Sequence, residues 1–170
     1  MHSVRFKAIE DSGGASTGGS LFHIVYTVVV CLTGIVLPLI FAKHITPVQW
    51  LTIIPTFCIA NFIEYAVHRW VMHRHIPQLL FVLKLHMIHH NYFNEDEYYL
   101  RKFPDFQMVV FPPVVLNVVL FAVTLPLAYV AYLIAGKNVG LLFIATVMAY
   151  YLLMQILHVA AHSAGLRDAK

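Results

Sequence analysis

Charged residues are scarce in this chain. Only 11% of its 170 residues are Asp, Glu, Lys or Arg, while 60% are hydrophobic and the mean hydropathy is +0.75. A water-soluble domain of this size needs many more polar side chains to cover its surface. The composition therefore excludes the ordinary soluble classes and predicts an integral membrane protein.

Cysteines and clustered basic residues are also few. Cys31 and Cys58 lie in separate apolar stretches and form no CxxC pair, which excludes a disulfide framework and a cysteine-based zinc knuckle. The 11 Lys and Arg residues are dispersed, so the net charge of +3 does not indicate nucleic-acid binding. The sequence also lacks a haem, flavin or nicotinamide motif, so redox chemistry would need a separate electron donor.

Four apolar stretches are long enough to cross a membrane as helices. Residues 1–20 are polar and rich in Gly and Ser, which predicts a flexible tail before one membrane-embedded domain over 21–170. The first stretch, residues 21–42, would be about 33 Å long as a helix, enough for a hydrocarbon core of roughly 30 Å. The other three are residues 47–66, 108–135 and 139–157. The predicted fold is an all-α membrane bundle of about four transmembrane helices with a histidine-rich helical cap.

Local signals mark the ends of the second stretch. Thr46, Pro47 and Gln49 have the pattern of a capping box with proline at the first helical position. Pro55 predicts a kink, and the helical pattern continues through His73 until Pro77 ends it.

Prolines and turn residues shape the segments that follow. Residues 78–92 predict a helix at the membrane interface, and residues 94–105 predict a charged loop. Three prolines within 108–135 allow either a bent helix or a re-entrant hairpin. A turn over residues 136–138 then leads to the last helix, which continues to His158 and His162.

The basic residues indicate an orientation. With four spans, nine of them fall on one side: Arg5, Lys7, Arg69, Arg74, Lys84, Arg101, Lys102, Arg167 and Lys170. Only Lys43 and Lys137 fall on the other side, which predicts that both termini are cytoplasmic. A hairpin over 108–135 would separate His158 and His162 from the remaining clustered histidines, so four spans are preferred.

Seven of the 11 histidines fall into three short spacings. The spacings are HX4H, HX2HH and HX3H, formed by His68 and His73; His86, His89 and His90; and His158 and His162. Residues three or four apart share one face of an α-helix, so the last two spacings each direct imidazoles toward a common point. Five residues turn a helix to about 140° from alignment, so HX4H needs ligation from two sides or a local bulge.

This pattern predicts a metal centre. Imidazole is the commonest neutral metal ligand, and seven histidines exceed what one ion needs, which favours two metals. Glu64 lies one turn before His68, where its carboxylate could receive an imidazole N–H, although an ordinary helix-end charge is an equal alternative. HX3H alone also arises often by chance. The isolated histidines at 2, 23, 44 and 75 are interpreted as interfacial residues.

The first two spacings resemble a known family. His68-Arg69-Trp70-Val71-Met72-His73 and Leu85-His86-Met87-Ile88-His89-His90 are similar to histidine boxes of the fatty acid hydroxylase/sterol desaturase superfamily, and the resemblance covers about residues 47–162. It implies a non-haem centre of two iron ions (zinc may substitute) at the cytosolic helix ends. It also implies that molecular oxygen is used to hydroxylate or desaturate a membrane lipid, with electrons from a separate reductase. All seven spaced histidines match the family's ligand positions.

Two departures from that family leave other functions open. Ser163 stands where many members have a further histidine, and the final HX2HH box of the family is not found before Lys170. Three expected ligands would then be missing, which is consistent with a fragment or with a degenerate, non-catalytic membrane protein that binds metal weakly. A metal transporter is a third alternative, although its histidines would be expected near the middle of the membrane.

Overall fold

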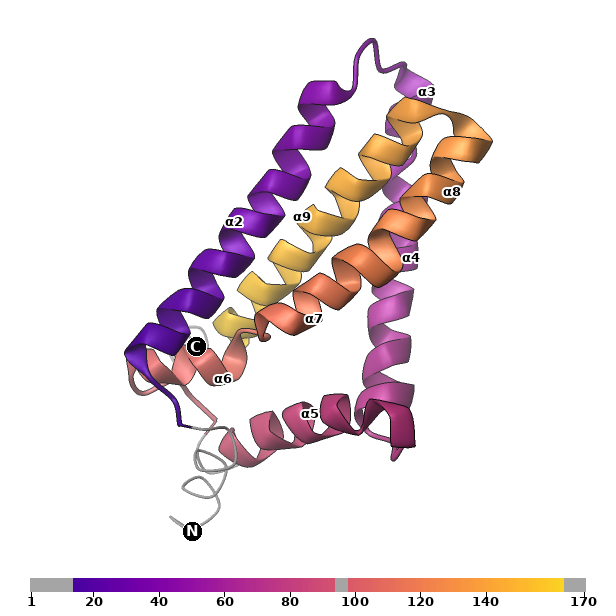
Figure 1. The fold of residues 1–170 in the computed structure, drawn as a ribbon. Coiled ribbons are helices and arrows are strands. Elements are labelled where there is room, and N and C mark those ends of the chain that lie inside the picture. Colours follow the sequence, from indigo (N-terminus) through magenta and orange to yellow (C-terminus); the bar gives the residue numbers. More distant parts are fainter. Residues whose placement is uncertain (1–13, 94–97, 164–170) are drawn as a thin grey trace, which may run out of the picture. The chain divides into compact units, whose positions relative to one another are not determined.

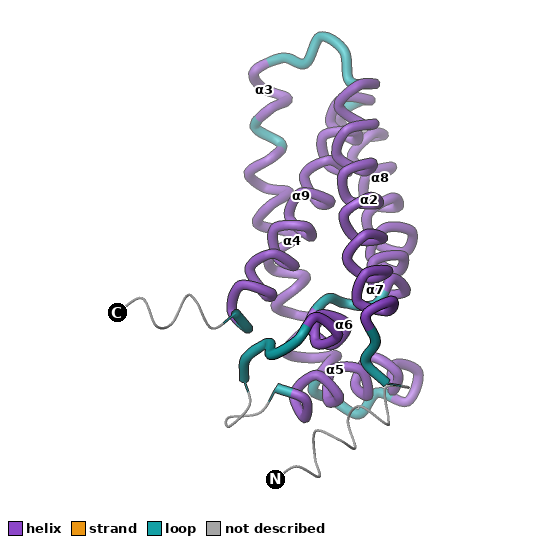
Figure 2. Tube along the Cα trace, turned by 90° about the vertical axis from the view of Figure 1, so that its left-hand side faces the viewer, coloured by secondary structure: helices purple, strands orange, loops and turns teal. Residues whose placement is uncertain are grey.

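The computed structural model describes residues 14–93 and 98–163, and every regular element in these residues is a helix (Figures 1 and 2). The α-helices are α2 (Thr17–Phe41), α3 (Pro47–Trp50), α4 (Ile53–Val67), α5 (Leu80–Tyr92), α6 (Phe106–Val109), α7 (Pro113–Asn117), α8 (Leu125–Ala135) and α9 (Lys137–Ala161). Two π-helical turns, η1 (His68–Met72) and η4 (Val118–Thr124), and two 3-10 turns, η2 (Pro77–Leu79) and η3 (Phe103–Asp105), connect them. The expected all-α fold is confirmed for this part of the chain.

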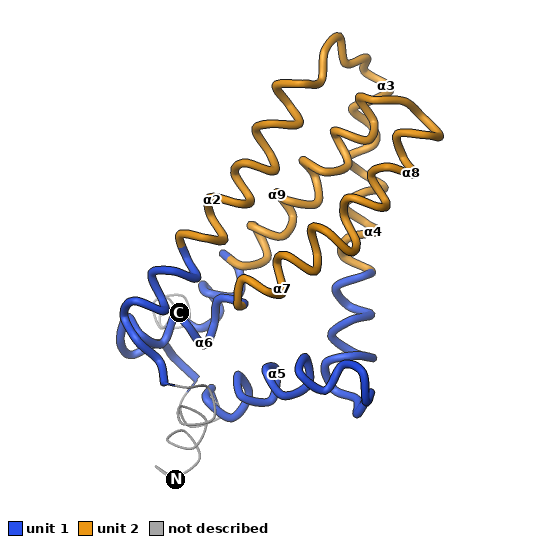
Figure 3. The backbone as a smooth tube through the Cα atoms, viewed as in Figure 1, with its two compact units in different colours: residues 1–24, 63–111, 156–170 blue, residues 25–62, 112–155 orange. Residues whose placement is uncertain are grey.

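The chain divides into two compact units (Figure 3). Unit 1 comprises residues 1–24, 63–111 and 156–170. Unit 2 comprises residues 25–62 and 112–155. All seven spaced histidines belong to unit 1, so the candidate site is described within that unit alone.

Four helical stretches are long and apolar enough to cross a membrane. They are Thr17–Phe41, Pro47–Met72, Phe103–Ala135 and Lys137–Ala161. Many of their large apolar side chains are exposed, including Leu133 at 62% and Ile134 at 80%. Such a surface is unsuited to water and suits contact with lipid tails. The expected number of candidate spans is confirmed.

The predicted start of the second span is confirmed. The Thr46 hydroxyl accepts a hydrogen bond from the Gln49 amide at 3.3 Å, and the Thr46 amide donates to the Gln49 side chain at 3.0 Å. The helix is then interrupted at residues 51–52. Pro55 has no N–H for the Leu51 carbonyl, which instead accepts from the Ile54 amide at 3.2 Å. The expected kink is therefore a break one turn before Pro55.

The third span is interrupted shortly after its expected start. Met108 belongs to the short helix α6, and residues 110–112 are not helical. Phe111 and Pro112 each precede a proline, a position that disfavours the α conformation. From Pro113 to Ala135, α7, η4 and α8 follow one another without interruption, so the bent-helix interpretation is correct.

A π turn accommodates Pro126 inside this helix. Proline cannot donate to the carbonyl one turn earlier, and its ring crowds that carbonyl. The turn η4 lies just before it, where the Leu125 amide bonds the Leu120 carbonyl and the Thr124 hydroxyl donates to the Val119 carbonyl at 2.9 Å. Wider turns of this kind resatisfy groups that a proline leaves unpaired.

Two helix starts, those of α2 and α9, lie a few residues before the expected positions. Helix α2 begins at Thr17, four residues before the expected position, and residues 1–13 of the expected tail lie outside the described residues. The turn expected over 136–138 is confined to Gly136, whose φ of 90° suits glycine, and Lys137 already begins α9. At Gly140, a Cβ would lie 2.9 Å from the Ala128 carbonyl oxygen, so α8 and α9 can approach closely there.

Candidate metal centre

A π turn brings the first histidine pair together. His68 begins η1 and His73 follows its last residue, so the two are five positions apart. In a π-helix the hydrogen-bonded partners are also five residues apart, which places such residues on one face. The two Nε2 atoms are 3.3 Å apart and the ring centroids 5.0 Å. The local bulge, one of two geometries left open for HX4H, is the one that the protein adopts.

Helix α5 adds two histidines to this pair. His86, only 7% exposed, places its Nε2 3.0 Å from Nε2 of His73 and 2.9 Å from Nε2 of His90. Ligand atoms of His68, His73 and His86 all lie within 4.8 Å of one another. These residues together with His90 are called the four-histidine group.

Hydrogen bonding alone does not account for these contacts. A neutral imidazole nitrogen carries either one proton or one lone pair in the ring plane, so it makes one good hydrogen bond. Nε2 of His73 has two imidazole neighbours, and so does Nε2 of His86. The contacts form a row from His68 through His73 and His86 to His90. At most two of these three contacts can therefore be hydrogen bonds at the same time. A cation among these nitrogens would accept their lone pairs without needing a proton in each contact.

The spacing of the nitrogens also fits a metal ion. Metal–imidazole bonds of about 2.0–2.1 Å place neighbouring ligand atoms about 2.9–3.4 Å apart in octahedral or tetrahedral geometry. The three contacts in the row measure 3.3, 3.0 and 2.9 Å. These three successive distances and the donor type therefore match neighbouring ligands of one coordination shell, with His68, His73 and His86 as its mutually close members.

A second group forms where α5 meets the end of α9. His89, His158 and His162 have ligand atoms within 4.8 Å of one another. Their ring centroids are 4.9 Å apart for His89 and His158, 5.1 Å for His89 and His162, and 5.2 Å for the α9 pair. These residues are called the three-histidine group, and they are less exposed than most of the four-histidine group.

Backbone carbonyls orient two members of the three-histidine group. Nδ1 of His89 lies 2.8 Å from the Met108 carbonyl oxygen, and Nδ1 of His162 lies 2.8 Å from that of Tyr98. A carbonyl only accepts, so each Nδ1 must carry the proton and each Nε2 keeps its lone pair. This arrangement, in which the second ring nitrogen donates to a fixed acceptor, is usual for metal-bound histidine.

The two groups lie next to each other on α5. The ring centroids of His86 and His89 are 6.4 Å apart, and those of His89 and His90 are 5.8 Å apart. The expectation that all three HX2HH histidines point to one place is therefore wrong: His86 and His90 contact each other, while His89 belongs to the other group. This proximity suits two metal ions that act on one substrate.

Burial keeps the imidazoles of α5 neutral. Loss of hydration and, to a smaller extent, neighbouring histidines, His90 first among them, together lower the pKa of His86 to about 3. Loss of hydration also lowers the pKa of His89 to about 4, against the opposing effect of its bond to Met108. The pKa values of His90 and His162 are lowered by the same main cause. Neutral imidazole is the form that binds metal.

These residues fit the metal centre expected from the sequence. The donors are imidazole nitrogens, which suit iron, zinc, copper and nickel. Four and three protein ligands also leave positions open on a six-coordinate ion for oxygen or substrate.

The other candidate residues lie outside these groups. Glu64 is half-buried on α4, and its part in orienting an imidazole stays a prediction. His23 contacts the Val110 carbonyl at 3.4 Å, while His44 and His75 are exposed. His2 lies outside the described residues.

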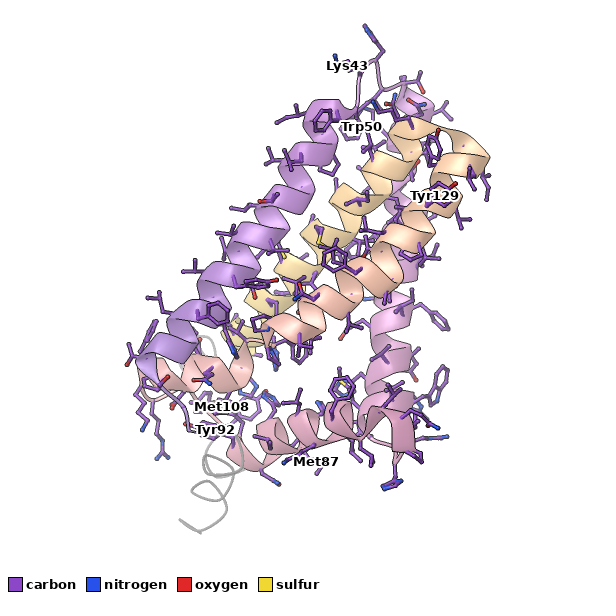
Figure 4. All side chains as sticks on the ribbon, in the orientation of Figure 1. Lys43, Trp50, Met87, Tyr92, Met108 and Tyr129 are labelled. Carbon is purple, nitrogen blue, oxygen red and sulfur yellow. The ribbon has the colours of Figure 1, made fainter. Side chains whose placement is uncertain are left out.

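The orienting carbonyls and the packing around them were not expected from the sequence. Every residue has a carbonyl, so no sequence signal marks Tyr98 or Met108. Tyr92 and Met108 lie close together in the hydrophobic core of unit 1, which also contains Ile88, Phe93 and Val109 (Figure 4). An isolated acidic residue before the third apolar stretch, Asp105, was the one available signal, and it is completely buried.

Comparisons of the chain with known protein families, with curated proteins and with solved structures found no match.

Proposed function

We propose that this chain is a membrane lipid oxidoreductase that holds two iron ions and uses molecular oxygen to hydroxylate or desaturate its substrate. The observation that carries the proposal is the convergence of seven histidines, from three separate segments, in two adjacent groups. The order and spacing of these segments resemble the fatty acid hydroxylase/sterol desaturase superfamily.

The location of the histidines supports a lipid substrate. His68 follows directly from α4, and His158 lies in the last turn of α9, so both occupy ends of candidate membrane spans. A metal centre at the end of apolar helices is within reach of an acyl chain or sterol entering from the bilayer. A metal transporter would place its ligands along the span instead. The excess of Lys and Arg on this side supports a cytoplasmic centre.

The chain's residues would bind and shield the metals, and other molecules would supply the electrons. When bound, the iron pair supplies oxygen activation and oxidation of a lipid C–H bond. Hydroxylation inserts one oxygen atom into that bond and releases the other as water, which consumes two electrons from a reductase and two protons from the solvent. The histidines of α5 would contribute ligands to both ions, and the carbonyls of Tyr98 and Met108 keep His162 and His89 in the tautomer that can bind metal.

The test is product formation by the purified chain. The protein would be reconstituted with ferrous iron in lipid nanodiscs, supplied with a reductase and ¹⁸O₂, and its lipids analysed by mass spectrometry. We expect ¹⁸O-labelled or desaturated lipid from the unsubstituted protein and none from the H86A/H89A double variant. The control is H75A, because His75 is exposed and outside both groups. Metal-loaded protein that yields no oxidised lipid would contradict the proposed function.

A further inference from the structure

Asp105 stands out as a buried carboxylate beside the metal centre. It is 0% exposed, ends the turn η3 and precedes α6. Burying an ionised carboxylate is costly unless several donors satisfy it. Asp105 has such donors: the Tyr92 hydroxyl at 2.5 Å on one oxygen, and the amides of Arg101 at 2.8 Å and Lys102 at 3.2 Å on the other. Asp105 therefore connects Tyr92 of α5 to the backbone of residues 101 and 102.

The segment joined in this way carries both carbonyls that orient the three-histidine group. Tyr98 lies seven residues before Asp105, and Met108 lies three residues after it. The part of this segment before Asp105 also contacts the residue that follows α9, because the Leu100 amide donates to the His162 carbonyl at 2.9 Å. The Tyr98 ring stacks on His162, with centroids 4.5 Å apart.

Tyr92 completes the connection to the ligands of α5. It lies one helical turn after His89 and is 0% exposed. Its neighbour Phe93 packs against His162, with ring centroids 4.3 Å apart. A displacement of Asp105 from Tyr92 would therefore move the acceptors of His89 and His162 relative to the helix that holds His89.

We propose that Asp105 is a positioning residue for one of the two metals, the one held by the three-histidine group. It acts through the Tyr98 and Met108 carbonyls, which hold His162 and His89 with Nε2 toward the ion. Asp105 thus makes the occupancy of one site, and not the other, depend on a carboxylate that touches neither metal.

This inference requires the metal centre of the proposed function but not its lipid chemistry. The test is the binding of Co²⁺ to the metal-free full chain in nanodiscs, followed by its visible absorption, which differs between the two sites because their ligand numbers differ. The unsubstituted protein should bind two ions with separable spectra.

Asp105→Asn is the main variant. The amide keeps the size of the side chain but turns one acceptor into a donor, which then faces the Tyr92 hydroxyl or the backbone amides. Loss of a partner that orients a metal ligand typically lowers affinity about 10–100-fold. We expect a loss of this size at the three-histidine site, with the affinity of the four-histidine site changed less than about threefold on the same scale. Tyr92→Phe removes a single hydrogen bond and should show the same selectivity with a smaller loss.

Ser20→Ala is the matched control. The Ser20 hydroxyl is also buried; it donates to the Pro104 carbonyl at 2.9 Å and accepts from the Gln107 amide at 3.0 Å. It therefore tests loss of a buried polar contact to the same segment, without direct contact to Asp105 or to either orienting carbonyl. S20A should leave both affinities unchanged. Equal weakening of both sites by D105N and Y92F, or retention of both, would overturn the proposal, as would an effect of S20A equal to that of D105N. Failure of the unsubstituted protein to bind Co²⁺ would overturn the metal centre itself. Metal binding without lipid product would overturn the lipid chemistry and leave the role of Asp105 intact.

Discussion

Replacement of His86 by alanine is expected to remove the metal of the four-histidine group. His86 is the central ligand, because its Nε2 lies 3.0 Å from that of His73 and 2.9 Å from that of His90. Without His86, no side chain among the described residues contacts both His73 and His90 through its Nε2. The ion would lose one bond and the alignment of the others.

The size of the effect follows from the number of ligands. A structural four-ligand zinc site contributes about 10–16 kcal/mol, or roughly 2.5–4 kcal/mol for each ligand. At about 1.4 kcal/mol for each factor of ten, loss of one ligand should weaken binding roughly 100- to 1,000-fold. Because the ligands act together, H68A/H86A should bind little more weakly than H86A alone.

The assay is competition for Zn²⁺ between the metal-free protein and a chelator of known affinity, with bound metal determined by mass spectrometry. H75A is the control, because this histidine is two residues from His73 but exposed and in neither group. Helix content should be measured for each variant, so that unfolding is separated from ligand loss. Equal Zn²⁺ affinity of H86A and H75A would refute the arrangement of the four-histidine group.

Three further predictions concern pH, helix packing and orientation. The pKa of His86 is lowered to about 3 and that of His89 to about 4, mainly by burial, whereas unfolded histidine has a pKa of about 6.5. The unfolded chain therefore binds more protons, and the metal-free protein should lose stability as the pH falls from about 6.5 toward 4, which denaturation followed by circular dichroism would show; a flat profile would contradict it. Gly140→Ala places a Cβ 2.9 Å from the Ala128 carbonyl oxygen and should destabilise the protein by roughly 1–3 kcal/mol. Gly18→Ala is the control, because Gly18 has open space around it. Equal thermal stability of the two variants would argue against close packing of α8 and α9. In a variant without Cys31 and Cys58, cysteines at positions 44 and 138 should react with an impermeant reagent applied from outside the cell, and a cysteine at 75 should not; the reverse pattern would invert the orientation.

Local signals in the sequence predicted the elements that local chemistry determines. Thr46 and Gln49 form the expected capping box because both partners lie within one turn. The π turn at His68 was one of two alternatives, and it is the geometry that lets residues five apart share a face. The seven histidines were predicted as ligands, and six of them form two groups of possible ligands, with His90 in contact with His86.

Features that depend on tertiary packing were not predicted. The assignment of His86 and His89 to different groups depends on where η1 and the end of α9 approach α5, which no spacing reveals. The same is true of the Met108 carbonyl, because Met108 was expected in one continuous helix and lies instead in the short helix α6, which ends at Val109. The early start of α2 at Thr17 reflects contacts of residues 16–20 with Pro104 and Gln107, residues distant in the sequence.

The most direct test of the metal centre is the metal content of the purified chain. The protein would be loaded with ferrous iron without oxygen, freed of excess metal by gel filtration, and assayed for iron per chain by elemental analysis. Two ions per chain are expected, one after replacement of either His86 or His89 alone, and none after replacement of both. A chain that retains no iron, or that retains the same amount when both histidines are replaced, would contradict the account.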